Sequence, residues 1–94
     1  MNGRAMTWAE RCDAARSVPI LDHLQSLGLG EARKCGKQLK MLCPFHGEMS
    51  ASFFIDPTRG LWNCFGCDAG GDGIGLWMKA RRVGFAQAVR EILP

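Results

Sequence analysis

The stretches Cys43–His46, of sequence CPFH, and Cys64–Cys67, of sequence CFGC, are two short pairs of metal-binding residues in a chain of 94 residues. Within each pair, two intervening residues form a tight turn, which lets both ligand atoms point at one ion. Thiolates and imidazoles are ligands that Zn²⁺ prefers in proteins, and two short pairs are the usual pattern of a tetrahedral site. We therefore predict a single zinc ion held by Cys43, His46, Cys64 and Cys67.

A metal site with four protein ligands is expected to be structural, because no position is left for a water or a substrate. The 17 residues between the two pairs are enough for a hairpin that brings both turns together, which is the arrangement of a zinc ribbon. A chain this short buries only a thin core, so metal binding would supply much of the folding free energy. We predict that the metal-free chain is largely unfolded in its middle section.

The other cysteines and the second histidine have simpler interpretations. Cys12 falls on the apolar face of a predicted helix and is expected in the core, whereas Cys35 is expected to be a spare thiol in a basic loop. His23 lies within a predicted helix and is expected to be exposed or packed. Cys64 and Cys67 alone would also fit a redox motif, but no βαβ pattern surrounds them.

Helices are predicted on both sides of the two pairs. Thr7 and Glu10 fit a capping box, and Ser17 fits the N-cap of the next helix. Asp72 fits an N-cap shortly after the second pair. Together with apolar residues at helical spacing, these signals predict helices over residues 8–16, 73–82 and 85–93, and another helix between Ser17 and Gly28.

Strands are predicted over residues 38–42, 51–56 and 61–63, the last two being antiparallel. Gly36 marks a turn after a basic loop, and Ala69–Gly71 is predicted to be a flexible corner. The sequence therefore predicts a small α+β fold, a zinc ribbon flanked by N- and C-terminal helices. The ribbon is a short antiparallel β-sheet with two zinc knuckles. We expect one domain over residues 1–94, with the ribbon core at about 36–68 and residues 1–6 disordered.

The composition places few limits on the partner. The formal net charge is +3, which is compatible with a polyanionic partner without requiring one. No apolar run approaches the roughly 18 residues of a membrane span, and we see no secretory leader. Clustered cysteines of this kind favour metal over disulfides, so we expect a cytoplasmic protein with no membrane partner.

Besides the two pairs, four short segments carry a family resemblance: Gly36–Lys40, Ser52–Phe53, Gly70–Asp72 and Phe85–Val89. With them, the chain from about residue 17 to 93 resembles the N-terminal zinc-binding domain of bacterial DnaG-type DNA primases. The same module occurs in phage and mobile-element primases. The resemblance implies a zinc ribbon that binds single-stranded template DNA and helps to choose where a primer starts.

The resemblance also implies a partner, because in this family the module works beside a primase catalytic domain or another replication protein. This chain alone is expected not to be an enzyme. Its acidic residues are scattered, and the sequence offers no nucleophile–base pair, carboxylate cluster or open metal site.

Single-stranded DNA is held by cations that contact phosphates and by aromatic rings on which bases stack. The ribbon offers both kinds of residue, and the predicted contacts are Lys34, Lys37, Lys40, Phe54, Arg59 and Trp62. Alternation along a strand allows only one of Phe53 and Phe54 to be in the core, and the resemblance favours Phe53. Phe45 and Phe65 either present further rings or shield the metal.

A different class of function is also open. A lysine-rich strand is often only a solvated face that binds nothing. If that is so here, the chain would be a free-standing zinc ribbon that docks onto another replication or mobile-element protein. A second basic cluster, Lys79, Arg81 and Arg82, either faces DNA or only covers a helix C-terminus, where cations are favoured. DNA binding that weakens with salt would favour the DNA-binding module.

Overall fold

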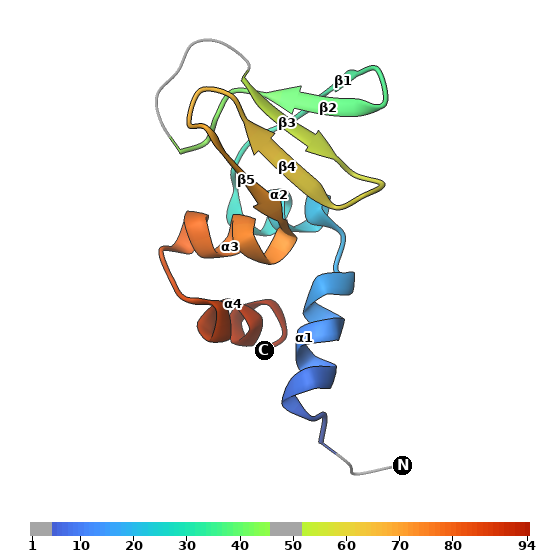
Figure 1. Ribbon diagram of the computed structural model, residues 1–94, viewed down its shortest axis with the longest axis vertical. Helices are drawn as coiled ribbons and strands as arrows, with labels where there is room; N and C mark the ends of the chain where they lie inside the picture. Colours follow the sequence, from blue (N-terminus) through green and yellow to red (C-terminus); the bar gives the residue numbers. More distant parts are fainter. Residues whose placement is uncertain (1–4, 46–51) are drawn as a thin grey trace.

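The computed structural model describes residues 5–45 and 52–94 (Figure 1). These residues form four helices: α1 (Trp8–Ser17), α2 (Ile20–Leu27), α3 (Gly73–Arg81) and α4 (Phe85–Ile92). They also form five strands: β1 (Arg33–Cys35), β2 (Gln38–Met41), β3 (Phe53–Asp56), β4 (Leu61–Cys64) and β5 (Ala69–Asp72). The sheet lies at one end of the molecule, and α3 lies between the sheet and α4 (Figure 1). No helix in this part of the chain is long and apolar enough to cross a membrane.

The strands form one antiparallel sheet in the order β1-β2-β3-β4-β5. Paired residues in such a sheet share a face, and successive residues alternate between faces. The inner face carries the buried side chains Met41, Phe53, Ile55, Trp62 and Cys64. The opposite side, here called the outer face, carries a row of residues paired across four strands, Arg33, Lys40, Phe54 and Asn63. The predicted small α+β fold with flanking helices is confirmed.

Two apolar clusters connect the helices to the sheet. In the first, Ile20 and Leu24 of α2 and Leu76 of α3 pack with the buried inner-face residues. The second cluster joins α1, α3 and α4 through Cys12, Ala15, Ile74, Ala88 and Val89. Full burial of such an aliphatic side chain contributes about 1.5–3 kcal/mol. Because α3 contributes to both clusters, it fixes the other helices relative to the sheet.

The N-terminal helices follow the prediction except at one junction. α1 begins with the expected capping box, in which the Thr7 hydroxyl accepts from the Glu10 N–H and the Glu10 carboxylate accepts from the Thr7 N–H. Gly28 ends α2 in the left-handed conformation, with a φ of 64°. The predicted N-cap role of Ser17 is wrong. Ser17 is the last residue of α1, and the N-cap of α2 is Pro19, which makes no side-chain hydrogen bond.

The predicted loop before Gly36 is instead strand β1. Gly36 and Lys37 form a two-residue turn that pairs Cys35 with Gln38, and Gly36 has a φ of 64°. A glycine with positive φ at the first position of a two-residue loop is typical of a tight hairpin. The turn chemistry was therefore present in the sequence, but the flanking residues are too polar to give an alternating strand pattern.

The predicted flexible corner at Gly70 and Gly71 is also wrong, because both residues lie in strand β5 and pair with β4. A Cβ atom at Gly70 would lie 2.8 Å from the carbonyl oxygen of Trp62. Glycine is thus required there by the close approach of two backbones. The remaining predicted elements agree with the structure to within two residues at each described end. Residues 1–4 of the segment predicted as disordered lie outside the described residues.

The predicted burial of the spare cysteines and of His23 can also be compared with the structure. Cys12 is buried, as predicted. Cys35 is exposed, but it ends strand β1 and does not lie in the predicted loop. His23 is packed, with 2% of its surface exposed, and its ring lies edge-on to Trp77 at a centroid distance of 5.3 Å. Burial lowers the pKa of His23 below its usual value, so the neutral imidazole is favoured.

Candidate metal centre

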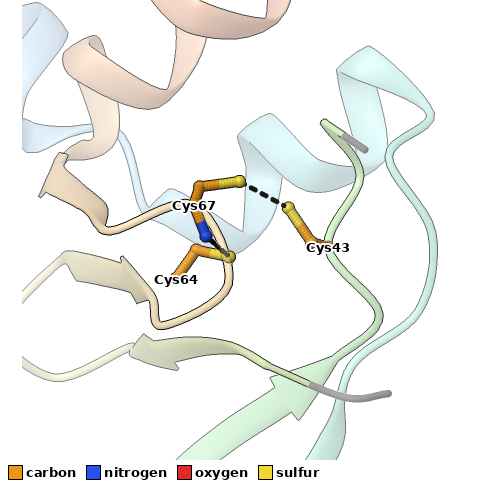
Figure 2. Close-up of side chains that lie close together, drawn as sticks. All are labelled: Cys43, Cys64 and Cys67. Atoms are coloured by element: carbon orange, nitrogen blue, oxygen red, sulfur yellow. Dashed lines mark hydrogen bonds between the residues drawn. The ribbon is translucent and has the colours of Figure 1, made fainter. Parts of the chain in front are cut away.

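Three cysteine side chains, one from the first pair and two from the second, converge at one end of the sheet (Figure 2). The Sγ atoms of Cys43, Cys64 and Cys67 all lie within 4.8 Å of one another. The Sγ atoms of Cys43 and Cys67 are 3.4 Å apart. Tetrahedral bonds of about 2.3 Å from zinc to sulfur separate the sulfurs by about 3.8 Å, so the three thiols already have nearly the spacing that Zn²⁺ requires.

Two strand ends and their turns place these thiols. Cys43 follows β2, Cys64 is the last residue of β4, and Cys67 lies in the turn that leads into β5. In the first turn the Phe45 N–H donates to Cys43 Sγ at 3.4 Å, and in the second the Cys67 N–H donates to Cys64 Sγ at 3.3 Å. Asp68 completes the second turn with a φ of 54°. Such N–H donors stabilise thiolates, which are the form that binds zinc.

The electrostatics of the three thiols also fit a divalent cation. Burial, followed by hydrogen bonds to Cys43 and then to Cys64, raises the pKa of Cys67 to about 12. Without a cation, a thiolate at Cys67 would be partly removed from water and close to the sulfur atoms of Cys43 and Cys64, so its protonated form is favoured. A bound dication reverses this preference and deprotonates the coordinating thiols outright. The donor set therefore suits zinc.

The fourth predicted ligand, His46, lies outside the described residues. Its position as a ligand remains a prediction from the CPFH sequence. Phe45, the residue immediately before His46, packs against the inner face of the sheet. Its ring lies 6.0 Å from the Phe53 ring and 5.8 Å from the Trp62 ring, centroid to centroid.

The predicted DNA contacts do not all share one surface. Lys40 and Phe54 are direct cross-strand partners on the outer face, where Arg33 pairs with Lys40 in turn. Lys34 pairs with Leu39 on the opposite side, although its side chain is exposed at the sheet edge. The two remaining cations lie in turns, Lys37 between β1 and β2 and Arg59 between β3 and β4.

Trp62 requires a correction, because its ring is not available as a stacking platform. The side chain points to the inner face, is 5% exposed, and stacks on Phe53 with an interplanar angle of 16°. Its indole N–H donates to the Asp72 carbonyl at 3.0 Å. The cause is strand alternation: Trp62 pairs with the core residue Ile55, so it must share the face of Ile55.

Phe65, unlike Trp62, has a ring that is exposed to solvent and could stack on a base. It lies in the second knuckle, is 70% exposed, and meets Phe54 edge-on at a centroid distance of 5.4 Å. Both rings line a shallow outer-face groove of about 250 Å³ whose other lining residues are Gln38, Asp56, Arg59, Leu61, Trp62 and Asn63. The Asp56 carboxylate in this groove accepts from the Arg59 N–H at 3.1 Å.

Arg33 is absent from the predicted DNA contacts and yet completes the outer-face row. The hairpin turn at Gly36–Lys37 would have located it, because that turn sets the register of the two flanking strands. Phe65 could be found only from the structure, since a ring beside a zinc knuckle points to solvent as readily as to the metal.

Comparison with known proteins agrees with this geometry. Residues 16–94 match the CHC2 zinc finger family. The DNA primase of Streptomyces coelicolor is 40% identical over 83 residues, which are 88% of this chain and 13% of that protein. The DNA primase of Borreliella burgdorferi is 44% identical over 57 residues, which are 61% of this chain and 11% of that protein. The chain thus corresponds to a small part of each primase.

A solved structure has the same fold. The Aquifex aeolicus primase, solved with its zinc-binding and RNA polymerase domains, superimposes with a TM-score of 0.77 and 28% identity. The alignment covers 87% of this chain and 20% of that chain. The three converging thiols, the matched family and this fold lead to one conclusion. The chain belongs to the CHC2 zinc finger family and is a zinc-binding domain of the DnaG primase type.

Proposed function

We propose that this chain binds single-stranded template DNA on the outer face of its sheet and helps a primase to start primers. The observation that carries the proposal is the row Arg33, Lys40, Phe54 and Asn63, which runs across four strands with Phe65 beside it. The described helices that cover the sheet pack on the inner face. In the row, Arg33, Lys40 and Asn63 are exposed and Phe54 is half-buried.

The chemistry of the outer face suits a single strand. Phe54 and Phe65 offer ring surfaces for bases, and base–aromatic stacking is worth about 1–3 kcal/mol per base. Arg33 and Lys40 are in register with Phe54, and Arg59 lines the same groove as the two rings, so we expect these cations to contact phosphates. Asn63 and Gln38 supply hydrogen-bonding groups between them. Proteins that bind single strands without sequence preference usually stack bases on aromatic rings and contact the phosphates with cationic side chains.

The metal would act by holding this surface together. We propose one structural zinc ion, with His46 as the ligand that completes the set of three thiolates. The ion would tie the end of β2 to the β4–β5 turn, and that turn carries Phe65. We further propose that residues 1–94 fold as one domain, since α3 packs against both the sheet and the helical cluster.

The primase relatives suggest the wider role. Each is several times longer than this chain, so nucleotide polymerisation is proposed for a catalytic domain beside this module. The alternative is a zinc ribbon that docks onto another replication protein. Exposed Leu61 and Leu42 are compatible with protein contact, but the rows of cations and rings favour nucleic acid.

The test is fluorescence anisotropy of a labelled single-stranded oligonucleotide with the zinc-loaded chain at two salt concentrations. We expect binding that weakens with salt, because phosphate contacts release counterions. Arg33→Gln should weaken binding several-fold, whereas Lys34→Gln should not. These neighbours have the same charge and lie on opposite faces of the sheet, so they form a matched pair.

Phe65→Ala should also weaken binding without loss of zinc, because its ring is mostly exposed. Equal effects of the Arg33 and Lys34 variants would argue against the outer face. Absence of binding at low salt, with zinc retained, would favour the docking alternative.

A further inference from the structure

The C-terminal end of α3 carries three cations that differ in their surroundings. Arg81 is neutralised, because its Nε lies 3.0 Å from the Glu91 carboxylate of α4. Within residues 5–45 and 52–94, neither Lys79 nor Arg82 forms an ion pair or a hydrogen bond through its side chain. Two of the three charges therefore have no anionic partner in the described part of the chain.

Lys79 and Arg82 line a common hollow of about 250 Å³. Pro44 and Phe45 of the first zinc knuckle form another part of its wall, and Ala80 completes it. The Lys79 ammonium lies 5.3 Å from the centroid of the Phe45 ring, a cation–π contact that holds the charge at the hollow. Among the described residues that line the hollow, two are cationic and none is acidic, so they favour an anion over a cation there.

The backbone at Arg82 is a second, independent observation. Arg82 ends α3 in the left-handed conformation, with φ 57° and ψ 47°. Glycine is the common residue at this position, since a side chain with positive φ is strained. Cations near a helix C-terminus are favoured by the helix dipole, which accounts for Lys79 and Arg81. The dipole alone does not explain a strained arginine where glycine would end the helix at lower cost, and strain of this kind often marks a functional residue.

We propose that Lys79 and Arg82 form an anion-binding site that takes a phosphate group in this hollow. The arginine offers a planar fork of N–H donors to two phosphate oxygens, and the lysine adds a point charge that Phe45 positions. The phosphate has two chemical sources. One is the backbone of a single strand that continues from the outer face past the metal centre, and this source rests on the proposed function. The other is the triphosphate of a free nucleotide.

Titration of the zinc-loaded, isotope-labelled chain with tripolyphosphate, followed by NMR, tests the site without nucleic acid. We expect amide shift changes at residues 44–45 and 79–83. Lys79→Gln and Arg82→Gln should each weaken binding about tenfold, which is typical of a hydrogen bond to a charged group. Arg81→Gln is the matched control, because it removes the same charge from the same helix end and should change the affinity less than twofold.

Arg82→Gly separates ligand binding from folding. Glycine relieves the positive φ, so the unfolding midpoint should stay equal or rise while tripolyphosphate binding falls as in Arg82→Gln. If Arg82→Gly kept full affinity, or if the Arg81 and Arg82 variants lost affinity equally, the proposal would be overturned.

Anisotropy with a labelled single strand identifies the source of the phosphate. A weaker affinity of the Lys79→Gln/Arg82→Gln double variant, with a smaller salt dependence, assigns the phosphate to the strand. Unchanged strand affinity together with lost tripolyphosphate binding assigns it to a free nucleotide. If the wild-type chain binds no strand at all, the proposed function fails, while the tripolyphosphate titration still decides whether the site exists.

Discussion

Trp62 stacks on Phe53 inside the core, with ring centroids 5.3 Å apart and an interplanar angle of 16°. The pair is next to the candidate metal centre, because Phe53 is the cross-strand partner of Cys64. Phe45 of the first knuckle packs against both rings. The first knuckle therefore contacts the aromatic core directly through Phe45. We expect a substitution in the core to alter the metal site as well.

Trp62→Ala should lower the free energy of unfolding of the zinc-loaded chain by about 3–5 kcal/mol, as expected for removal of a buried aromatic side chain. It also removes the hydrogen bond from the indole to the Asp72 carbonyl. Urea unfolding followed by circular dichroism measures this loss. Trp62→Phe keeps most of the ring and should cost less. If the Trp62→Ala variant were as stable as the wild-type chain and bound zinc but no longer bound DNA, Trp62 would be a DNA contact instead.

Removal of the metal should unfold the sheet. Structural zinc supplies about 10–16 kcal/mol in zinc-finger peptides, and the thin core here leaves little to replace it. Excess chelator, or Cys64→Ser at a fully buried thiol, should abolish the strand signal in circular dichroism. Cys35→Ser is the control, because Cys35 is exposed and is not one of the three converging thiols.

Zinc content, measured by a metal-sensitive dye, tests His46 in the same series. His46→Ala should bind zinc more weakly than the wild-type chain. A chelator-treated chain with an unchanged spectrum would contradict the structural role of the metal, and full zinc affinity in His46→Ala would remove His46 from the ligand set.

Gly70→Ala should destabilise the chain by about 1–3 kcal/mol, the usual cost of forcing atoms into a packed site. The new Cβ would lie 2.8 Å from the Trp62 carbonyl oxygen, and neither backbone can move without breaking strand pairing. Gly71→Ala is the matched control in the same strand, since its Cβ would meet the nearest atom at 3.5 Å. Thermal unfolding of both variants checks the prediction, and equal midpoints would refute the close approach.

Glu91 should make the stability of the helical cluster depend on pH in the acid range. Hydrogen bonds from Arg81 first, and then from Trp77 and Gln87, lower the pKa of Glu91 from 4.5 to about 2. Because the pKa of the folded state is the lower one, the carboxylate stabilises the fold above about pH 4.5. That contribution is lost as the pH falls from about 4.5 towards 2.

Glu91→Gln should therefore be less stable than the wild-type chain at pH 7, and the difference should shrink at pH 3.5. Because both chains lose zinc in acid, the comparison at pH 3.5 follows the unfolding of the helical cluster, which contains none of the converging thiols. Urea unfolding at both pH values gives the difference, and NMR titration of the Glu91 carboxyl gives its pKa. A stability difference that stays constant with pH would contradict the assigned hydrogen bonds.

The sequence by itself determined the local features of this protein. The Thr7–Glu10 capping box, the Asp72 N-cap and the helix end at Gly28 depend on neighbouring residues, so they could be predicted and are observed. The CPFH and CFGC pairs identified the candidate metal site for the same reason, because a ligand pair on one turn is a short-range feature. The structure brings its three described ligands together.

Only the tertiary structure decided which residues share a surface. Arg33 and Lys34 are neighbours in sequence with the same charge, but strand pairing places them on opposite faces. Trp62 and Phe65 are both aromatic residues at the second knuckle, yet one is buried by its pairing with Ile55 and the other is exposed. Gly70 belongs to a strand because its backbone pairs with that of Asn63 in β4. These outcomes depend on the pairing register of the strands and on which face of the sheet the helices cover, and composition alone encodes neither of them.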